Sequence, residues 1–460
     1  MKRACILLGM CALILVCSRC RKAETFSDNG YDERLSGGGL ATVFDITSKA
    51  FTHSVSGLSS RDAAVQKRGD VAFEQTFVSA PAPLFGGLGP VFNNVSCISC
   101  HHNDGKGTPT AGTVRSSLLF RINAGLYTEH GGPAGVDGYG GQIQDVGLQG
   151  VTPEANISIN YTETTFTYPD GNTASLRSPS YTLFNLYLPI SGAYQLSPRL
   201  APPVFGLGLL ANVPESTILA FADQADADQD GISGKANYVY NPQTKQKELG
   251  RFGLKANTPT LAVQVATAYQ QDMGVTSSIQ PLKSCYGQTQ MNPRDEHAGP
   301  DLPDSTLNAV IFYIKTLAVP ARRDVQLENV QKGQALFSQI NCSGCHKSTI
   351  QTGVDLNAPY LSNQRIHPYT DLLLHDMGEG LADGYTDYLA EGTEWRTAPL
   401  WGIGLFEKTN GTPYYLHDGR ARTMEEAILW HGGEAQRSRD QFTKLSKTER
   451  DELISFLHSL

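Results

Sequence analysis

Two short segments of this sequence place two cysteines and a histidine at a spacing that suits covalent haem attachment. Both have the pattern Cys-x-x-Cys-His, at residues 97–101 and 342–346. Thiols at this spacing can form thioethers with the two vinyl groups of a haem, and the adjacent histidine can coordinate the iron. A ribbon-type zinc site would need a second cysteine or histidine pair, which the sequence does not offer. The motifs therefore predict two haem c groups, held by Cys97, Cys100, His101, Cys342, Cys345 and His346.

The ligand on the far side of each iron decides what that haem does. An iron with two strong protein ligands carries electrons, whereas an iron with an open face can bind peroxide or oxygen. His102 directly follows a proximal histidine and cannot reach the opposite face of the same haem. Other histidines and methionines beyond the N-terminal segment are candidates: His130, His297, His367, His375, His417, His431, Met273, Met291, Met377 and Met424.

The N-terminal segment has the features of an export signal. A basic start precedes an apolar run over residues 4–16, which is too short to span a bilayer as a mature helix. Cys17 and Cys20 follow, and a polar stretch begins behind them. We expect a lipoprotein-type signal peptide at residues 1–20, with lipid on Cys20 or Cys17; an ordinary cleaved signal and an uncleaved anchor are the alternatives. Each predicts a periplasmic location, and the first predicts attachment to a membrane through the lipid alone.

Composition narrows the class of partner and the use of cysteine. The 460 residues are 40% hydrophobic and 18% charged, with a net charge of −8, which fits a globular protein and argues against a nucleic-acid partner. Of nine cysteines, four lie in the N-terminal segment and four in the two motifs, so Cys285 alone is left over. An exported protein with this distribution has no disulfide framework and uses its cysteines to hold a cofactor.

The chain divides into four predicted segments. The signal peptide precedes a polar tether and lead-in at 21–70, an N-terminal haem domain with a loop-rich insertion at 71–324, and a C-terminal cytochrome c domain at 325–460. Helical periodicity before the second motif and the capping-box sequence Ser446-Lys-Thr-Glu449 near the end frame this last domain. We expect a mainly α protein with long loops and minor β structure, built from two cytochrome c-like haem domains.

Further sequence blocks resemble one family. They cover most of residues 85–460, occur in order, and are similar to blocks of the di-haem oxidoreductases, a family related to the bacterial di-haem cytochrome c peroxidases and to the di-haem maturase of methylamine dehydrogenase. The blocks are Val91–Asn93, Asp104–Gly107, Tyr139–Gln142, Asp228–Gly234, Gly250–Gly253, Leu374–Gly378, Glu394–Trp401 and Tyr415–Arg420.

The resemblance implies a pair of catalytic residues at the first haem. In the peroxidases, a Gln and a Glu ten positions apart face the haem that binds peroxide, and Gln144 and Glu154 have this spacing. A carboxyl group there can take a proton from one peroxide oxygen and return it to the other, and an apolar pocket would raise its pKa accordingly. The alternative is that Glu154 is a solvated turn residue.

For the second haem, the resemblance implies a ligand fourteen residues after a His-Asp-Gly turn. That turn begins at His417, so the implied ligand is His431, with Met377 and His375 as alternatives. His417 itself is expected to brace the turn. The peroxidases also carry a histidine that caps the first haem, but this chain has neither His nor Met between His102 and His130. The first haem is then open from the start, or it has a weak cap from His130 or a tyrosine.

An acidic segment gives a calcium prediction. Asp226, Asp228 and Asp230 with Gly231 form the first half of a calcium loop, although the twelfth position is Asn237 and not the usual Glu. The alternative is a hydrated acidic turn.

Together these features predict a peroxidase-like oxidoreductase. A small-molecule oxidant such as peroxide would react at the N-terminal haem, and the C-terminal haem would receive electrons from a redox donor protein. Trp395, Trp401 and Trp430 are possible relays, or only packing residues. The alternatives are a non-catalytic di-haem electron carrier and a maturase-like enzyme that oxidises a partner protein.

Overall fold

The computed structural model describes residues 33–113, 116–285, 287–290 and 299–460, and the chain from Glu33 onward packs as one compact unit. The predicted signal peptide with Cys17 and Cys20 lies outside the described residues, as do Met291 and His297. Within the described part, no helix is both long enough and apolar enough to cross a membrane.

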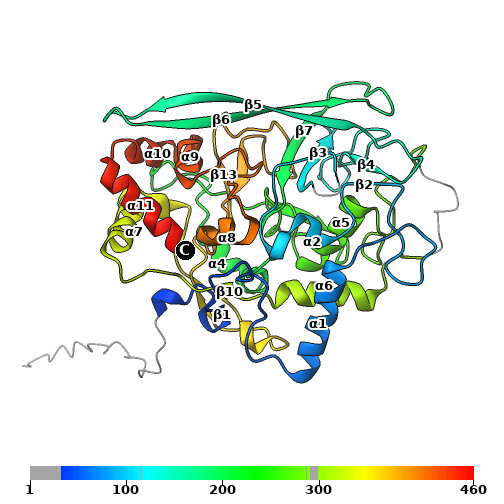
Figure 1. Cartoon of the computed structure of the whole chain (residues 1–460), viewed down its shortest axis with the longest axis horizontal. Helices are drawn as coiled ribbons and strands as arrows, with labels where there is room; N and C mark the ends of the chain where they lie inside the picture. Colours follow the sequence, from blue (N-terminus) through cyan, green and yellow to red (C-terminus); the bar gives the residue numbers. More distant parts are fainter. Residues whose placement is uncertain (1–32, 114–115, 286, 291–298) are drawn as a thin grey trace, which may run out of the picture. The chain divides into compact units, whose positions relative to one another are not determined.

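The prediction of a mainly α protein built from two cytochrome c-like domains is wrong. Only 28% of the residues are helical and 18% lie in strands, and the strands of the described ranges pair two by two into small sheets (Figure 1). The Gly-, Pro- and Thr-rich middle of the chain suggested loops. Alternating Ile, Tyr and Thr side chains within it instead form strands, which is where β-branched and aromatic residues fit best.

The longest sheet is the hairpin of β5 (Asn156–Thr167) and β6 (Thr173–Phe184), which runs along the top edge of Figure 1 above β3, β7 and α9. The cross-strand pairs Ile157–Leu183 and Ile159–Tyr181 pack against a buried cluster that includes Phe120 and Ile143. The remaining strand pairs are β1 (Thr42–Val43) with β10 (Val319–Pro320), β2 (Val91–Phe92) with β4 (Val146–Gly147), β3 (Leu118–Asn123) with β7 (Gln195–Leu200), β8 (Tyr238–Asn241) with β9 (Gln246–Leu249), β11 (Ile350–Gln351) with β12 (Arg365–Ile366), and β13 (Leu374–Asp376) with β14 (Glu394–Arg396).

The hairpin is fastened to the turn that precedes the predicted ligand His431. The Arg177 guanidinium donates hydrogen bonds to the backbone oxygens of Gly419 and Arg420, at 2.9 and 3.0 Å. The Tyr181 hydroxyl donates to the Asp418 carboxylate at 3.0 Å. This long-range contact fixes the position of the turn, because the hydrogen bonds join residues more than 200 positions apart.

Three helices surround the first motif, which itself forms the short helix α2 (Cys97–Cys100). Helices α1 (Ser60–Glu74) and α6 (Asp304–Lys315) cross at Gly69, where a Cβ would lie 2.0 Å from the Ala309 carbonyl oxygen, so only glycine permits this approach. Helix α5 (Leu261–Met273) is capped by the Thr260 side chain and ends at Gly274 in the left-handed conformation.

Helices α7 (Glu328–Gln339) and α11 (Lys447–Ser459) frame the second motif, as the sequence predicted. They touch at Gly333, where a Cβ would lie 2.0 Å from the Glu452 carbonyl oxygen. The predicted capping box is confirmed, with Ser446 and Glu449 bonding each other's backbone N–H groups. The shorter helices are α3 (Leu207–Ala211), α4 (Glu215–Leu219), α8 (Phe406–Asn410), α9 (Met424–Leu429) and α10 (Gln436–Phe442).

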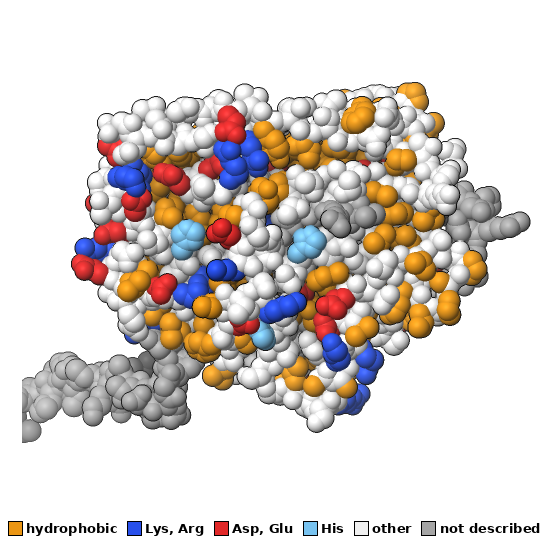
Figure 2. All heavy atoms as spheres, viewed as in Figure 1, with side chains coloured by type: hydrophobic (Ala, Val, Ile, Leu, Met, Phe, Trp, Pro, Cys, Tyr) orange, Lys and Arg blue, Asp and Glu red, His pale blue; other side chains and the backbone are white. Residues whose placement is uncertain are grey.

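One large hydrophobic core joins the surroundings of both motifs. It includes Phe73 and Tyr313 near the first motif and Phe337 and Phe456 near the second. The division into two domains at residue 325 stays a prediction. On the face drawn in Figure 2, basic and acidic side chains are interspersed over the left and lower parts, and the right part is largely uncharged.

Candidate haem-binding cavity

Both Cys-x-x-Cys-His motifs open onto the same internal cavity. Its volume is about 890 Å³, and its lining includes Cys97 and His101 of the first motif together with Cys342, Cys345 and His346 of the second. Apolar side chains such as Phe73, Phe337 and Leu453 form much of the wall. A cavity of this size and character suits a large, mostly apolar ligand with a few polar groups.

The two motif histidines are held in the same way, each with one ring nitrogen free to coordinate an iron. In each motif the histidine N–H bonds back to the carbonyl of the first cysteine, so one turn brings the thiols and the ring together. The Nδ1 atom of His101 donates to the Pro202 carbonyl oxygen at 2.7 Å, and that of His346 donates to Tyr369 at 2.9 Å. Burial lowers the pKa of both rings to about 4. Each ring is therefore neutral, with Nδ1 anchored and Nε2 left to bind a metal.

The thiols of the motifs fit thioether formation. None of the described cysteines forms a disulfide. Burial raises the pKa of Cys97 and of Cys342 to about 12, so both stay protonated at neutral pH. Neutral thiols beside an apolar cavity suit attachment to a haem vinyl group better than capture of a zinc ion, which requires thiolates.

The predicted second-haem ligands His431 and Met377 both line this cavity. His431 follows α9, its Nδ1 atom donates to the Ala427 carbonyl oxygen at 2.8 Å, and burial lowers its pKa. His431 is also close enough to His346 for its charge to lower the pKa of that ring. The choice between His431 and Met377 stays a prediction.

Two other histidines of the cavity wall have different surroundings. Both ring nitrogens of His375 are held by carboxylates, Nε2 by Asp371 at 2.9 Å and Nδ1 by Glu434 at 2.6 Å, and its pKa is raised to about 12. This leaves His375 no nitrogen for an iron. His417 stacks on Trp395 with ring centres 3.7 Å apart. Both Trp395 and Trp401 line the cavity, and Arg420 lies 4.8 Å from the centre of the Trp430 ring.

Gln144 and Glu154 lie side by side but outside the cavity lining. The Gln144 N–H donates to the Glu154 carboxylate at 2.6 Å, and the Glu154 N–H donates to the Gln144 carbonyl oxygen at 2.8 Å. The Glu154 side chain is fully buried, so it is not a solvated turn residue. Burial raises its pKa to about 8. Gln144 contacts the cavity wall at Gln271, whose carbonyl oxygen accepts from Gln144 Nε2 at 2.7 Å; the catalytic role of both residues stays a prediction.

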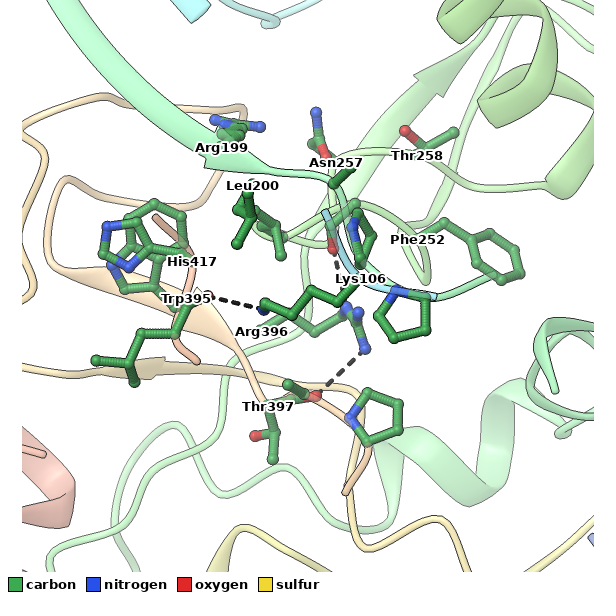
Figure 3. A pocket seen from close by; sticks show the side chains of 18 of the residues that line it. Lys106, Arg199, Leu200, Phe252, Asn257, Thr258, Trp395, Arg396, Thr397 and His417 are labelled. Carbon is green, nitrogen blue, oxygen red and sulfur yellow. Dashed lines mark hydrogen bonds between the residues drawn. The ribbon is translucent and has the colours of Figure 1, made fainter. Parts of the chain in front are cut away.

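Sequence reasoning missed the positive side chains in the wall. Lys106, Arg199 and Arg396 face the cavity near Trp395 and His417 (Figure 3). Lys106 donates to the Leu416 carbonyl oxygen at 2.9 Å, and burial lowers its pKa to about 8; burial also lowers the pKa of Arg396, to about 10. Arg199 already pairs with Asp387 at 2.9 Å. Buried cations are costly without an anion, so Lys106 and Arg396 fit the propionate groups of a haem. Lys106 and Arg396 stand in the blocks that carry the family resemblance, which was the available indication.

The acidic segment forms a cluster that differs from the predicted one. Carboxylate oxygens of Asp223, Asp226 and Asp228 lie within 4.8 Å of one another. Asp230 instead accepts a hydrogen bond from the Ile232 N–H at 2.8 Å. Calcium binding here stays a prediction, with Asp223 as a member that the sequence pattern did not indicate.

Comparison with known proteins gives one informative match. No curated protein matches the chain. Among solved structures, a chain of the hydrazine synthase of Kuenenia stuttgartiensis aligns over 96% of this chain and 99% of its own, with 14% identity and a TM-score of 0.35. Both values are too low for this likeness to show a shared fold. Residues 31–460, however, match the family described as "Di-haem oxidoreductase, putative peroxidase". The chain therefore belongs to the di-haem oxidoreductase family.

Proposed function

We propose that this family member is a peroxidase-like enzyme in which a small-molecule oxidant such as peroxide reacts beside the first motif and electrons enter beside the second. The observation that carries the proposal is the shared cavity, onto which both motif histidines open. Haem c bound at both motifs would supply iron that exchanges electrons with the oxidant and with the donor. Reduction of one peroxide to two waters takes two electrons and two protons, and the electrons come from a reduced donor protein.

The walls next to the two motifs support different roles. The residues of β3 and α5 that line the cavity include Leu119, Arg121 and Asp272 but no histidine or methionine. This supports an open face opposite His101. Opposite His346, His431 is the proposed ligand and Met377 the alternative. Two imidazoles would hold that haem at a lower potential than a His/Met pair.

The location is proposed from the sequence alone. The signal-like residues 1–20 support export to the periplasm and a lipid anchor at Cys20 or Cys17. Calcium is proposed at the acidic cluster of Asp223, Asp226 and Asp228, with the carboxylate oxygens as its ligands.

An electron paramagnetic resonance spectrum of the ferric protein, made in cells with the haem-attachment machinery, tests the proposal. We expect one high-spin and one low-spin haem, a Soret change on adding hydrogen peroxide, and turnover with a reduced artificial donor. The control omits the donor and should show no sustained peroxide consumption. Two low-spin haems whose spectra do not change with peroxide would instead support an electron carrier. A peroxide response followed by oxidation of a partner protein alone would support the maturase-like alternative.

A further inference from the structure

Two charged side chains of opposite sign face the cavity beside the first motif, and no role has been assigned to them. Arg121 lies on β3, whose alternate residues Leu119 and Arg121 line the cavity while Leu118, Phe120 and Ile122 are buried in a separate core. Asp272 lies on the last turn of α5. The alternation of a strand and the end of a helix thus bring a cation and a carboxylate to one wall.

Asp272 is held next to the haem-attachment cysteines. One oxygen of its carboxylate accepts a hydrogen bond from Gln142 Nε2 at 2.9 Å, which fixes the side chain. The Asp272 charge acts on both Cys97 and Cys100 and raises the pKa of each. Tyr269, one turn earlier on the same helix, is within hydrogen-bonding reach of Cys97. The carboxylate therefore stands in the cavity wall close to the first pair of haem-attachment cysteines.

Arg121 is near Asp272 without being neutralised by it. Each of the two groups shifts the pKa of the other, yet these two described side chains form no ion pair with each other. Burial raises the pKa of Asp272 above its usual range, which makes its protonated form accessible. A carboxyl group that can exchange a proton and a guanidinium that can stabilise negative charge are the two groups that cleavage of a peroxide bond calls for.

Glu154 has a different position. It contacts the backbone of Gln144, and Gln144 in turn contacts the carbonyl oxygen of Gln271, the residue before Asp272. Its influence on the cavity therefore passes through the end of α5.

We propose that Asp272, assisted by Arg121, is the group that exchanges protons with the oxidant, and that Glu154 is a positioning residue behind it. The inference rests on the proposed peroxidase-like function. Asp272 accepts the proton of one peroxide oxygen and returns it to the other as the O–O bond breaks, and the departing oxygen leaves as water. Two electrons from the reduced donor protein and two protons from solvent convert the remaining oxygen into the second water. Arg121 stabilises the negative charge that develops between these transfers.

Cyanide association with the ferric holo-protein tests this without turnover. Cyanide exists as HCN at neutral pH and must lose its proton when it binds as the anion, so a nearby base accelerates the association that the Soret shift follows. We expect Asp272→Asn to slow association by about 100-fold, the lower range for loss of a general base, and Asp272→Glu to recover much of the rate.

The matched control is Asp145→Asn, because Asp145 is a buried carboxyl group, bonded to Asn93 and Gly112, that does not line the cavity. Its rate should stay within about twofold of wild type, since it removes no base from the cavity.

The outcomes separate the two proposals. Glu154→Gln should slow association less than Asp272→Asn. If Asp272→Asn binds cyanide as fast as wild type while Glu154→Gln binds slowly, the assignment of Asp272 is overturned and the proposed function stands. If Asp272→Asn loses its first haem, Asp272 is a structural residue and the assignment also fails. If the wild-type protein has two low-spin haems and binds no cyanide, both proposals are overturned.

Discussion

The two Cys-x-x-Cys-His motifs are alike in sequence and in the anchoring of their histidines, but they face different walls of one cavity. In both, burial lowers the pKa of the motif histidine to about 4 and a backbone carbonyl accepts from its Nδ1 atom. The wall near the first motif carries Arg121 and Asp272, whereas the second shares its part of the cavity with His431.

On the proposed function, this difference means that the motif determines haem attachment and that the facing elements determine the reactivity of each haem. Strand β3 and helix α5 bring charged groups to the first site. The turn fastened by Arg177 and Tyr181, followed by α9, brings a neutral imidazole to the second. A site that offers a proton donor and an open face can react with an oxidant, and a site with two imidazoles can only pass electrons.

Removing one cysteine pair at a time should have the largest effect, because it removes one of the two predicted haem sites. Cys97→Ala/Cys100→Ala and Cys342→Ala/Cys345→Ala should each halve the covalent haem per chain, because each pair forms both thioethers of one haem. The pyridine haemochrome assay measures this loss. The first variant should also lose the response to peroxide and cyanide, whereas the second should keep the cyanide response.

The control for the cysteine variants is Cys285→Ala, because Cys285 is buried outside both motifs. Its haem content should equal that of wild type. A full haem complement in either double variant would contradict the attachment sites. Equal loss of the cyanide response in both would contradict the proposal that the first site binds small ligands and the second passes electrons.

Local sequence patterns predicted the features that depend on neighbouring residues. The motifs, the helices on either side of the second motif and the Ser446–Glu449 capping box needed only contacts within a few positions. Gln144 and Glu154, the pair that the resemblance implied, contact each other, and their catalytic role stays a prediction. The β content was missed because Thr- and Ser-rich strands have the same composition as loops, and only their alternation separates the two.

Features of the site that depend on long-range contacts could not be predicted from the sequence. Arg121 and Asp272 are about 150 positions apart and belong to a strand and a helix that the sequence did not place beside each other. Nothing local distinguishes Asp272 from an exposed helix residue. Glu154 was expected at the haem from its spacing; in the fold it lies outside the residues that line the cavity and is linked to them through Gln144 and Gln271.

Changing the proposed sixth ligand should alter one haem only. His431→Ala should convert the second haem from low spin to high spin and raise its reduction potential, because one imidazole is lost from the iron. Met377→Leu should leave the spectrum of this haem unchanged. Paramagnetic resonance and a redox titration measure both effects. If Met377→Leu produces the change and His431→Ala does not, the ligand set is His/Met and the second site is a higher-potential centre.

The smallest expected effect concerns Glu154 and the dependence of stability on pH. Burial raises its pKa from 4.5 to about 8 in the folded protein, so between these values the folded chain holds a proton that the unfolded chain has released. The stabilisation from this group is complete below pH 4.5 and is lost as pH rises through about 8. Glu154→Gln removes this dependence, and its unfolding free energy relative to wild type should therefore rise between pH 5 and pH 9.

Urea unfolding of the holo-protein at several pH values measures this rise, with Glu129→Gln as the exposed control, whose side chain is 84% accessible. If wild type and Glu154→Gln change in parallel, the Glu154 carboxyl group is ionised in the folded protein at neutral pH. It would then be a charged group outside the cavity lining, and only its distance from the cavity would distinguish its role from that of Asp272.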